Sequence, residues 1–466
     1  MSALHIALNR FGLGARTGEA RSLDDPRGWL LDQLDGETPG LVGRDFSPDD
    51  DAELFRALLS ALRSADQERV AELRRRVRRR RQAEMSAVLT TRITTDRPFV
   101  ERWVAFWSNH LCVSSADGFQ TALLAGAYER EVIRPHVFSR YETMVLASAR
   151  HPAMLYYLDN VRSVGPESRA ARRPRRASGP AADRLRGLNE NYARELLELH
   201  TVGVEGGYVQ DDVRELARIL TGWGVSGMRP GRGGGSGIEG ATGGLGFRFT
   251  PPTHEPGSKR VMGRTYPEGE EGGVEVIRDL ARHPSTARFL AGKLASHFID
   301  DAPPTSAIEA IERSWLDTEG DLREVARTLV ELDAAWDPSY RKFRTPQDWF
   351  VAVLRAVDAP EAGSNFPQIL QQLRHPLWAP PSPKGFGDLR REWADPDALM
   401  NRAELARTLA RRVGRGRGGR PRDLRPLATV VDVPPDDPLP AMLADPSIPA
   451  DERIALAFAG PAFQWR

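Results

Sequence analysis

The stretch 189–203 concentrates side chains that can do chemistry. Glu195 and Glu198 are three residues apart, so a helix brings their carboxylates onto one face together with Asn191. Two carboxylates held close on a rigid element can ligate a metal ion or act as a general acid and base. We therefore predict a catalytic or metal-binding patch here, formed by Asn191, Arg194, Glu195, Glu198 and His200.

Arg194 gives the same patch a second interpretation. Glu190, Arg194 and Glu198 follow one another at intervals of four residues, which is the spacing of ion pairs on a solvated helix face. Such a ladder stabilises a helix by only about 0.3 kcal/mol per pair and needs no ligand. The ion ladder and the site both remain open at this point.

Three histidines are candidate further ligands. His200 falls on the apolar arc of the 189–203 helix, and His110 shares an aromatic face with Trp107, so both point inward. For both, the alternative is a buried, hydrogen-bonded histidine. His254 lies on a Pro-rich loop near Lys259, where binding residues often gather. The metal hypothesis assigns a divalent ion to His110, Glu195, Glu198 and His254.

Four residues near these candidates are predicted to contact a bound ligand: Asn189, Trp107, Trp223 and Lys259. His-Pro pairs at His151, His283 and His375 each precede an expected helix, so we interpret them as helix-capping devices and not as site residues.

An arginine-rich run, 74–81, begins at Arg74 and ends at Arg81. Val70, Leu73 and Val77 keep an apolar stripe through it, so we interpret the run as a solvated helix face. The alternative is an anion- or nucleic-acid-binding surface. A net charge of +1 and the lack of interleaved aromatic residues argue against nucleic acid.

Composition narrows the remaining classes. The chain has 466 residues and one cysteine, Cys112, which excludes an internal disulfide and multi-cysteine metal sites. Only four of its 65 cationic residues are lysines, which we interpret as a codon bias. No Gly-x-Ser-x-Gly elbow, phosphate loop or His-Glu-x-x-His helix occurs. The start of the chain lacks a leader-like apolar run, so we expect a cytoplasmic protein without an integral membrane segment.

Periodicity predicts a mainly α protein, a large multi-helix, bundle-like domain over residues 1–466 with a minor β-hairpin at 247–266. The two strand-like pieces, 247–250 and 260–266, are expected to pair with each other. Composition also predicts a flexible Arg/Pro-rich loop at 161–187, a Gly-rich loop at 226–246 and a Gly/Arg-rich loop at 414–422.

Taken in order, these segments resemble a bacterial family catalogued as domain of unknown function 1800. The matching pieces are 8–12, 101–110, 151–160, 189–223, 254–263, 283–298, 343–349, 376–393 and 463–466. The resemblance carries no established activity. It implies that relatives are often exported, and it points to a partner from a family that looks sulfatase-like, whose genes often lie beside theirs.

Three functions therefore remain open. The first is a metal-assisted or carboxylate acid/base enzyme, a hydrolase or oxidoreductase, with its site on the 189–203 helix. The second is a non-catalytic scaffold or partner protein with a buried polar network. The third is an anion-binding protein that uses Arg74 to Arg81.

Overall fold

The computed structural model describes residues 2–17, 19, 23–43, 45–172, 187–226, 245–413, 424–431, 433 and 437–466. Most of the predicted loops at 161–187, 226–246 and 414–422 lie outside these residues. Within them the chain is mainly α-helical, as the periodicity predicts. Every helix in the described ranges is either too short or too polar to serve as a membrane span.

The regular elements described in the N-terminal part of the chain are all helices. Its elements are α1 (Ala3–His5), the π-helical η1 (Ile6–Phe11), α2 (Pro26–Asp32), α3 (Pro48–Arg63), α4 (Gln67–Thr94), α5 (Pro98–His110), α6 (Phe119–Tyr128), η3 (Glu129–Ile133), α7 (Arg134–His136), α8 (Tyr141–Arg150), α9 (Pro152–Tyr157), η4 (Asn160–Arg162) and α10 (Arg169–Arg172).

The middle of the chain holds the short strands. Its elements are α12 (Asn191–Glu195), the π-helical η5 (Leu196–His200), α13 (Gln210–Leu220), β1 (Trp223–Val225), β2 (Phe247–Phe249), η7 (Pro251–Thr253), β3 (Lys259–Val261), β4 (Arg264–Tyr266), α14 (Glu270–Arg282), α15 (Pro284–Phe298), α16 (Thr305–Asp317), α17 (Leu322–Glu331) and α18 (Asp333–Trp336).

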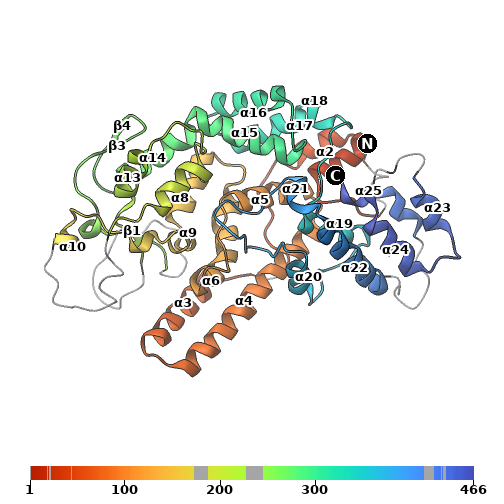
Figure 1. The fold of residues 1–466 in the computed structure, drawn as a ribbon, viewed down its shortest axis with the longest axis horizontal. Helices are drawn as coiled ribbons and strands as arrows, with labels where there is room; N and C mark the ends of the chain where they lie inside the picture. The colour runs from red at the N-terminus through yellow and green to blue at the C-terminus, as the bar shows by residue number, and fades with distance from the viewer. Residues whose placement is uncertain are drawn as a thin grey trace.

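The C-terminal part is helical again. It comprises α19 (Pro346–Ala356), α20 (Phe366–Gln372), α21 (Arg390–Trp393), α22 (Pro396–Val413), η8 (Arg425–Thr429), α23 (Leu439–Ala444), α24 (Ala450–Ala459) and α25 (Pro461–Gln464). Figure 1 shows α5 and α21 near the middle of the molecule, α22 to α25 at one end and the α3–α4 hairpin projecting away from the body.

Helix α5 lies at the centre and is buried on nearly every side, and its buried charges, Glu101 and Arg102, are paired with Arg134 and Asp348. Pro98 occupies the first turn, where its missing N–H costs nothing. Trp103 and Trp107 are fully buried, and their rings meet edge to face at 5.7 Å. Truncation of either tryptophan to alanine is expected to destabilise the fold by about 3 to 5 kcal/mol.

Two hydrophobic cores flank this helix. One is built mainly from α5, α6, α8 and α15 to α17, and the other from α19, α20, α22 and α24. Between them runs the N-terminal segment 10–14, and three buried arginines bind its alternate carbonyl groups. Arg466 donates to Arg10 O at 3.0 Å, Arg102 to Gly12 O at 2.6 Å and Arg355 to Gly14 O at 2.7 Å. These bonds satisfy carbonyls that no helix or sheet pairs.

The predicted hairpin at 247–266 is wrong in its pairing. Strand β2 pairs antiparallel with β1, with Trp223 opposite Phe249, while β3 pairs with β4 through a turn at Met262 and Gly263. The two strand-like pieces therefore belong to two separate two-stranded sheets. Trp223 supplied no alternating pattern long enough to mark β1, so the sequence did not identify the partner of 247–250.

Two of the three His-Pro pairs cap helices, as predicted. His151 Nδ1 accepts a hydrogen bond from Ala153 N, and His283 Nδ1 accepts one from Ser285 N, each at 3.1 Å. The prediction is wrong for His375, which precedes no helix directly. Its ring instead stacks on Trp393, with centroids 4.8 Å apart, and lines a cavity.

Candidate functional site

The 189–203 segment forms a surface ion ladder. Arg194 pairs with Glu190 at 3.3 Å and with Glu198 at 3.4 Å, and the side chains are between one quarter and two fifths exposed. Glu195 is partly buried, and its pKa is raised first by that burial and then by the charge of Glu198. Asn191 is exposed. The ladder interpretation is confirmed, and at this exposure it contributes little stability.

The structure does not bring the four predicted metal ligands together. His254 Nδ1 lies 2.8 Å from Thr221 O, and its Nε2 accepts a hydrogen bond from Gly269 N at 3.0 Å, so neither ring nitrogen is available. The described ranges contain no group of three or more His, Cys, Asp and Glu side chains that could hold a metal ion. The metal hypothesis thus has no ligand set in this part of the chain.

The predicted ligand contacts serve mainly to hold elements in place. Asn189 Oδ1 accepts from Asn191 N at 2.9 Å at the start of α12. Lys259 donates to Glu255 O and is buried, and Trp223 packs edge to face on Phe247 at 5.0 Å. Trp107 is a core residue whose ring lies behind His110, with centroids 5.6 Å apart. Of the four, only Trp107 adjoins the site described next.

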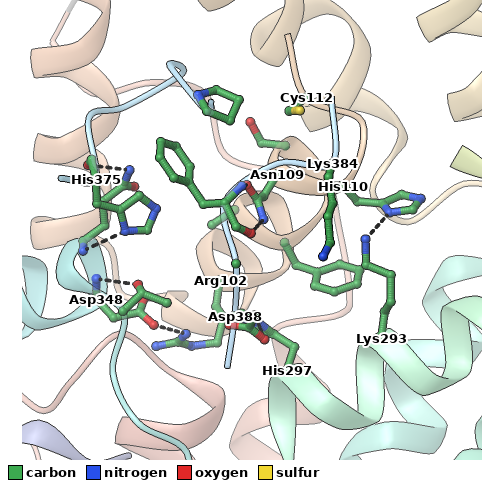
Figure 2. A pocket seen from close by; sticks show the side chains of 18 of the residues that line it. Arg102, Asn109, His110, Cys112, Lys293, His297, Asp348, His375, Lys384 and Asp388 are labelled. Atoms are coloured by element: carbon green, nitrogen blue, oxygen red, sulfur yellow. Dashed lines mark hydrogen bonds and ion pairs between the residues drawn. The ribbon is translucent and has the colours of Figure 1, made fainter. Parts of the chain in front are cut away.

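A cavity of about 470 Å³ opens between α5, α15, α19 and the segment 376–393, which we call the strap. Residues of both hydrophobic cores line it, including Phe106 and Val113 on one side and Val351 and Trp378 on the other. Ligand sites favour such seams between packed units. Figure 2 shows charged and imidazole side chains entering the cavity from all of these elements.

Two hydrogen bonds between the Asn109 side chain and the strap backbone fix the strap to the end of α5. The Asn109 side chain donates from Nδ2 to Phe386 O at 2.9 Å, and its Oδ1 accepts from Phe386 N at 2.8 Å. Gly385 has φ +84°, and a Cβ there would lie 2.5 Å from Asn109 O. Cys112 also contacts the strap through Pro383 O at 3.2 Å, and burial raises the pKa of its thiol to about 12.

Lys293 and His110 form the central pair of the cavity. Lys293 Nζ lies 2.9 Å from His110 Nδ1 (Figure 2). On the far side of the ring, Nε2 lies 3.0 Å from the Tyr141 hydroxyl and 3.3 Å from His200 O, and the Tyr141 hydroxyl also donates to His200 O. Because that carbonyl can only accept, Nε2 carries the hydrogen and Nδ1 is the acceptor for the Lys293 amine.

The surroundings disfavour positive charge on this pair. Burial lowers the pKa of Lys293 to about 8, and the charge of Lys384 adds to that shift, while the charge of Asp388 opposes it. Burial and then the Lys293 charge hold the pKa of His110 well below its usual range. The imidazole is therefore neutral, and the amine is partly neutral near physiological pH.

The segment chosen from the sequence does reach this site, through its backbone. His200 ends the π-helical turn η5, and its carbonyl oxygen accepts the Tyr141 and His110 bonds. Thr201 donates to Leu196 O at 2.6 Å, which satisfies a carbonyl left over at that turn. π-Helical turns often occur at functional sites. The buried His200 side chain, whose pKa burial lowers to about 3, acts as a core histidine.

A second imidazole, His297, lines the same cavity. His297 Nδ1 is 3.0 Å from Asp388 Oδ2, and Lys342 Nζ is 3.4 Å from the same oxygen. Burial lowers the pKa of His297 to about 4. Burial of Asp388 would raise the pKa of its carboxyl, but His297 and Lys342 outweigh that effect and hold this pKa well below its usual range. His297 Nε2 has no hydrogen-bond partner in the part of the chain that is described.

The opposite end of the cavity is held by Asp348. Arg102 Nη1 lies 3.1 Å and Arg466 Nε 3.5 Å from its Oδ2. Burial would raise the pKa of Asp348, but the charges of these two guanidinium groups outweigh that effect and hold the pKa well below its usual range. His375 completes this end, with its ring between Phe386 and Trp393.

Two lysines line the cavity without a direct carboxylate partner among the described residues. Neither Lys293 nor Lys384 forms an ion pair with a carboxylate in the described ranges. Figure 2 shows Lys384 reaching from the strap toward the interior, on the side of Lys293 and His110. The chain has only four lysines, and a third, Lys342, supports Asp388 from behind. An anion is the complement that this end of the cavity lacks.

Sequence reasoning did not identify most of this site. It found His110 and Trp107, but not Lys293, Lys384, His297 or Asp388. The scarcity of lysine could have indicated these positions. Because 61 of the 65 cationic residues are arginine, a position that keeps lysine is a candidate for a role that a guanidinium group cannot fill. The interpretation of this scarcity as codon bias overlooked that two of the four lysines line one cavity and that a third pairs with a carboxylate of its wall.

Comparisons with known proteins place the whole chain in one group. The pattern of a family described as "Protein of unknown function (DUF1800)" matches residues 6–465. No curated protein and no solved structure matches the chain. The resemblance noted in the sequence is thereby confirmed.

Proposed function

Since this chain belongs to the DUF1800 family of proteins of unknown function, its chemistry has to follow from the cavity, and we propose that it is an enzyme acting on a small organic anion, with Lys293 as base or nucleophile. One observation carries the proposal: an amine that meets a neutral imidazole at 2.9 Å inside a cavity of about 470 Å³. Pockets of this size hold small molecules.

The pair has the properties of a reacting group and not of a structural one. A structural buried lysine is paired, as Lys342 is with Asp301 at 2.7 Å. Lys293 instead donates to an acceptor that carries no charge, and it keeps a surface on the cavity. Amines whose pKa is lowered in this way serve as bases and nucleophiles in enzymes.

The test of anion binding uses succinate and its uncharged diamide as probes. Isothermal titration calorimetry is expected to show binding of succinate and none of the diamide. Lys384→Met is expected to weaken succinate about tenfold, because a charge-assisted hydrogen bond contributes about 1.5 kcal/mol. Lys384 is exposed, so this variant should fold normally.

Arg313→Met is the matched control, because Arg313 is an exposed cation on α16 that does not line the cavity. Removal of its charge is expected to leave succinate binding unchanged. Equal binding of the diamide, or an equal loss in both variants, would contradict the proposal.

The α3–α4 hairpin supports a second candidate function, the binding of a polyanion. On α4, Val70, Leu73 and Val77 are buried, whereas Arg74, Arg75, Arg76, Arg78 and Arg79 are exposed. The predicted apolar stripe is thus confirmed, and the arginines face outward on a projecting element (Figure 1). Five arginines spread over the solvent side of the helix can contact neighbouring phosphates or sulfates.

Fluorescence anisotropy with labelled heparin tests this function. Exchange of the five arginines for glutamine is expected to weaken binding and to reduce the slope of log affinity against log salt by about five. The same slope for both proteins would refute it. Succinate binding should not change, since the cavity lies on other elements.

A further inference from the structure

We propose that Lys293 forms an imine with an aldehyde or ketone that also carries an anionic group, which Lys384 binds. This inference rests on the proposed function and assigns it a substrate class, the small oxo acids. It is carried by the arrangement of the two lysines, His110 and the open space between them.

The orientation of the Lys293 amine favours attack on a ligand. One N–H of the amine is directed to His110 Nδ1 at 2.9 Å, and the tautomer of that ring is fixed from behind by Tyr141 and His200 O. Lys293 lines the cavity, so a ligand there can reach the other side of its nitrogen. An amine fixed in this way has already lost the rotational freedom that a reaction would otherwise cost.

The surface of α15 beside the Lys293 backbone is open toward the cavity. Gly292 lies next to Lys293 in the middle of α15, and a Cβ built there would meet no atom within 4 Å. A glycine inside a helix costs about 1 kcal/mol relative to alanine. Phe106 and Phe289 form the nearby apolar wall. Such a wall excludes water, which assists the dehydration that ends imine formation. Lys293 Nζ also lies 5.6 Å from the centroid of the Phe289 ring, so this ring retains the ammonium form in the cavity before it loses its proton.

Lys384 supplies the second contact. It enters the cavity from the strap, whereas Lys293 enters from α15, so one molecule can lie between the two amines (Figure 2). A carboxylate on the substrate would balance the Lys384 charge and turn the carbonyl carbon toward Lys293. The partner is thus recognised by two features, a carbonyl group and an anionic group.

The step balances without an oxidant, a reductant or a metal. The Lys293 lone pair forms a C–N bond to the carbonyl carbon, whose oxygen becomes a hydroxyl group. The C–O bond of this carbinolamine then breaks, the C=N bond forms, and both amine hydrogens leave with the oxygen as one water molecule. His110 Nδ1 accepts a hydrogen from the amine and returns it to the departing hydroxyl.

The test traps the imine by reduction. The full chain is incubated at pH 7 with pyruvate and sodium cyanoborohydride, and the four lysines are read by peptide mass spectrometry. A neutral fraction set by a pKa of about 8 instead of 10.5 makes Lys293 roughly 300-fold richer in reactive amine than an ordinary lysine. Among the four lysines we expect one adduct, on Lys293, with the exposed Lys384 as the internal comparison.

Variants separate the two lysines. Lys293→Arg keeps the charge but not the nucleophile, so the adduct should disappear. Lys384→Met should reduce trapping of pyruvate about tenfold and leave trapping of the neutral ketone acetone unchanged. Arg313→Met should change neither.

The outcomes distinguish this inference from the function on which it rests. Adducts spread equally over Lys384 and Lys293, or no adduct in a protein that binds succinate, would overturn the imine and leave the anion-binding enzyme standing. Absence of both succinate binding and adduct would overturn both. If Lys384→Met reduced the trapping of acetone as much as the trapping of pyruvate, Lys384 would have no role in recognising the anionic group.

Discussion

His110 connects the two parts of the molecule that carry its chemistry. One ring nitrogen faces Lys293 in the cavity, and the other faces Tyr141 and the carbonyl of His200 at the end of η5. The aromatic neighbours of His110 are those of a core histidine, yet its Nδ1 is also a proton acceptor at the cavity wall. Burial alone does not separate these roles; the identity of the group on each nitrogen does.

The reactivity of Lys293 should depend on pH with a midpoint near 8. Burial lowers the pKa of this amine from its usual 10.5, so the neutral form appears above about pH 8. Labelling by acetic anhydride, followed by mass spectrometry from pH 6 to 11, is expected to rise through that value. His110, His200, Lys384, Asp388 and Cys112 are the titratable groups around it. A midpoint near 10.5 would contradict the buried environment.

Replacement of His110 by phenylalanine tests the proton acceptor. The ring keeps its stacking on Phe106, whose plane lies within 7° of the imidazole, but Nδ1 is lost. Trapping of pyruvate on Lys293 is expected to slow about a hundredfold, as removal of a general base does. Succinate binding should persist, because Lys384 is untouched. An unchanged trapping rate would exclude His110 from the reaction.

The strap closes the space between the two cores and adds charged side chains to it. It carries Lys384 and Asp388, and it has little regular structure apart from α21. Its position depends on Asn109, which pairs with the backbone of Phe386 as a neighbouring strand would. The close approach requires a residue without Cβ at Gly385.

Gly385→Ala should therefore damage the site, and Gly263→Ala should not. Both glycines have nearly the same φ, +84° and +83°, so both substitutions carry about 1 kcal/mol of backbone strain. Only at Gly385 does the new Cβ collide, 2.5 Å from Asn109 O. We expect a further loss of about 1 to 3 kcal/mol in thermal unfolding and weaker succinate binding there. Equal stability and binding in the two variants would show that the strap does not need this contact.

Over the whole molecule, burial governs the ionisable groups. Burial lowers the pKa of His200 and of His375 to about 3 and that of His297 to about 4, so the folded protein keeps these rings neutral. In the unfolded chain they bind protons near pH 6.5. The unfolded state therefore takes up more protons as the pH falls below 6.5, and the fold loses stability from there down to about pH 4.

Each such histidine should contribute about 1.4 kcal/mol of lost stability per pH unit in that interval. His375→Gln is expected to be less stable than the parent at pH 7 but to lose stability less steeply between pH 6 and 4.5 in urea unfolding. His136→Gln, at a partly exposed position outside the cavity, is the control. The same pH slope in all three proteins would contradict a neutral His375 in the fold.

The sequence by itself determined the helices and the direction of single side chains. The spacing of Trp103, Trp107 and His110 turned His110 inward, and the spacing of Glu190, Arg194 and Glu198 built the surface ladder. Both follow from the helical repeat, which is a local property that neighbouring residues set without help from the rest of the chain. The family resemblance likewise followed from local motifs.

Only the tertiary structure decided which of these side chains meet. Lys293 and His110 are 183 residues apart, and Asn109 and Phe386 are 277 apart. Their contacts depend on how two cores and a strap dock, and the periodicity of one helix carries no record of what packs against it. For the same reason the sequence favoured the carboxylates of 189–203, which are neighbours along the chain, over a cavity whose members become neighbours only through folding.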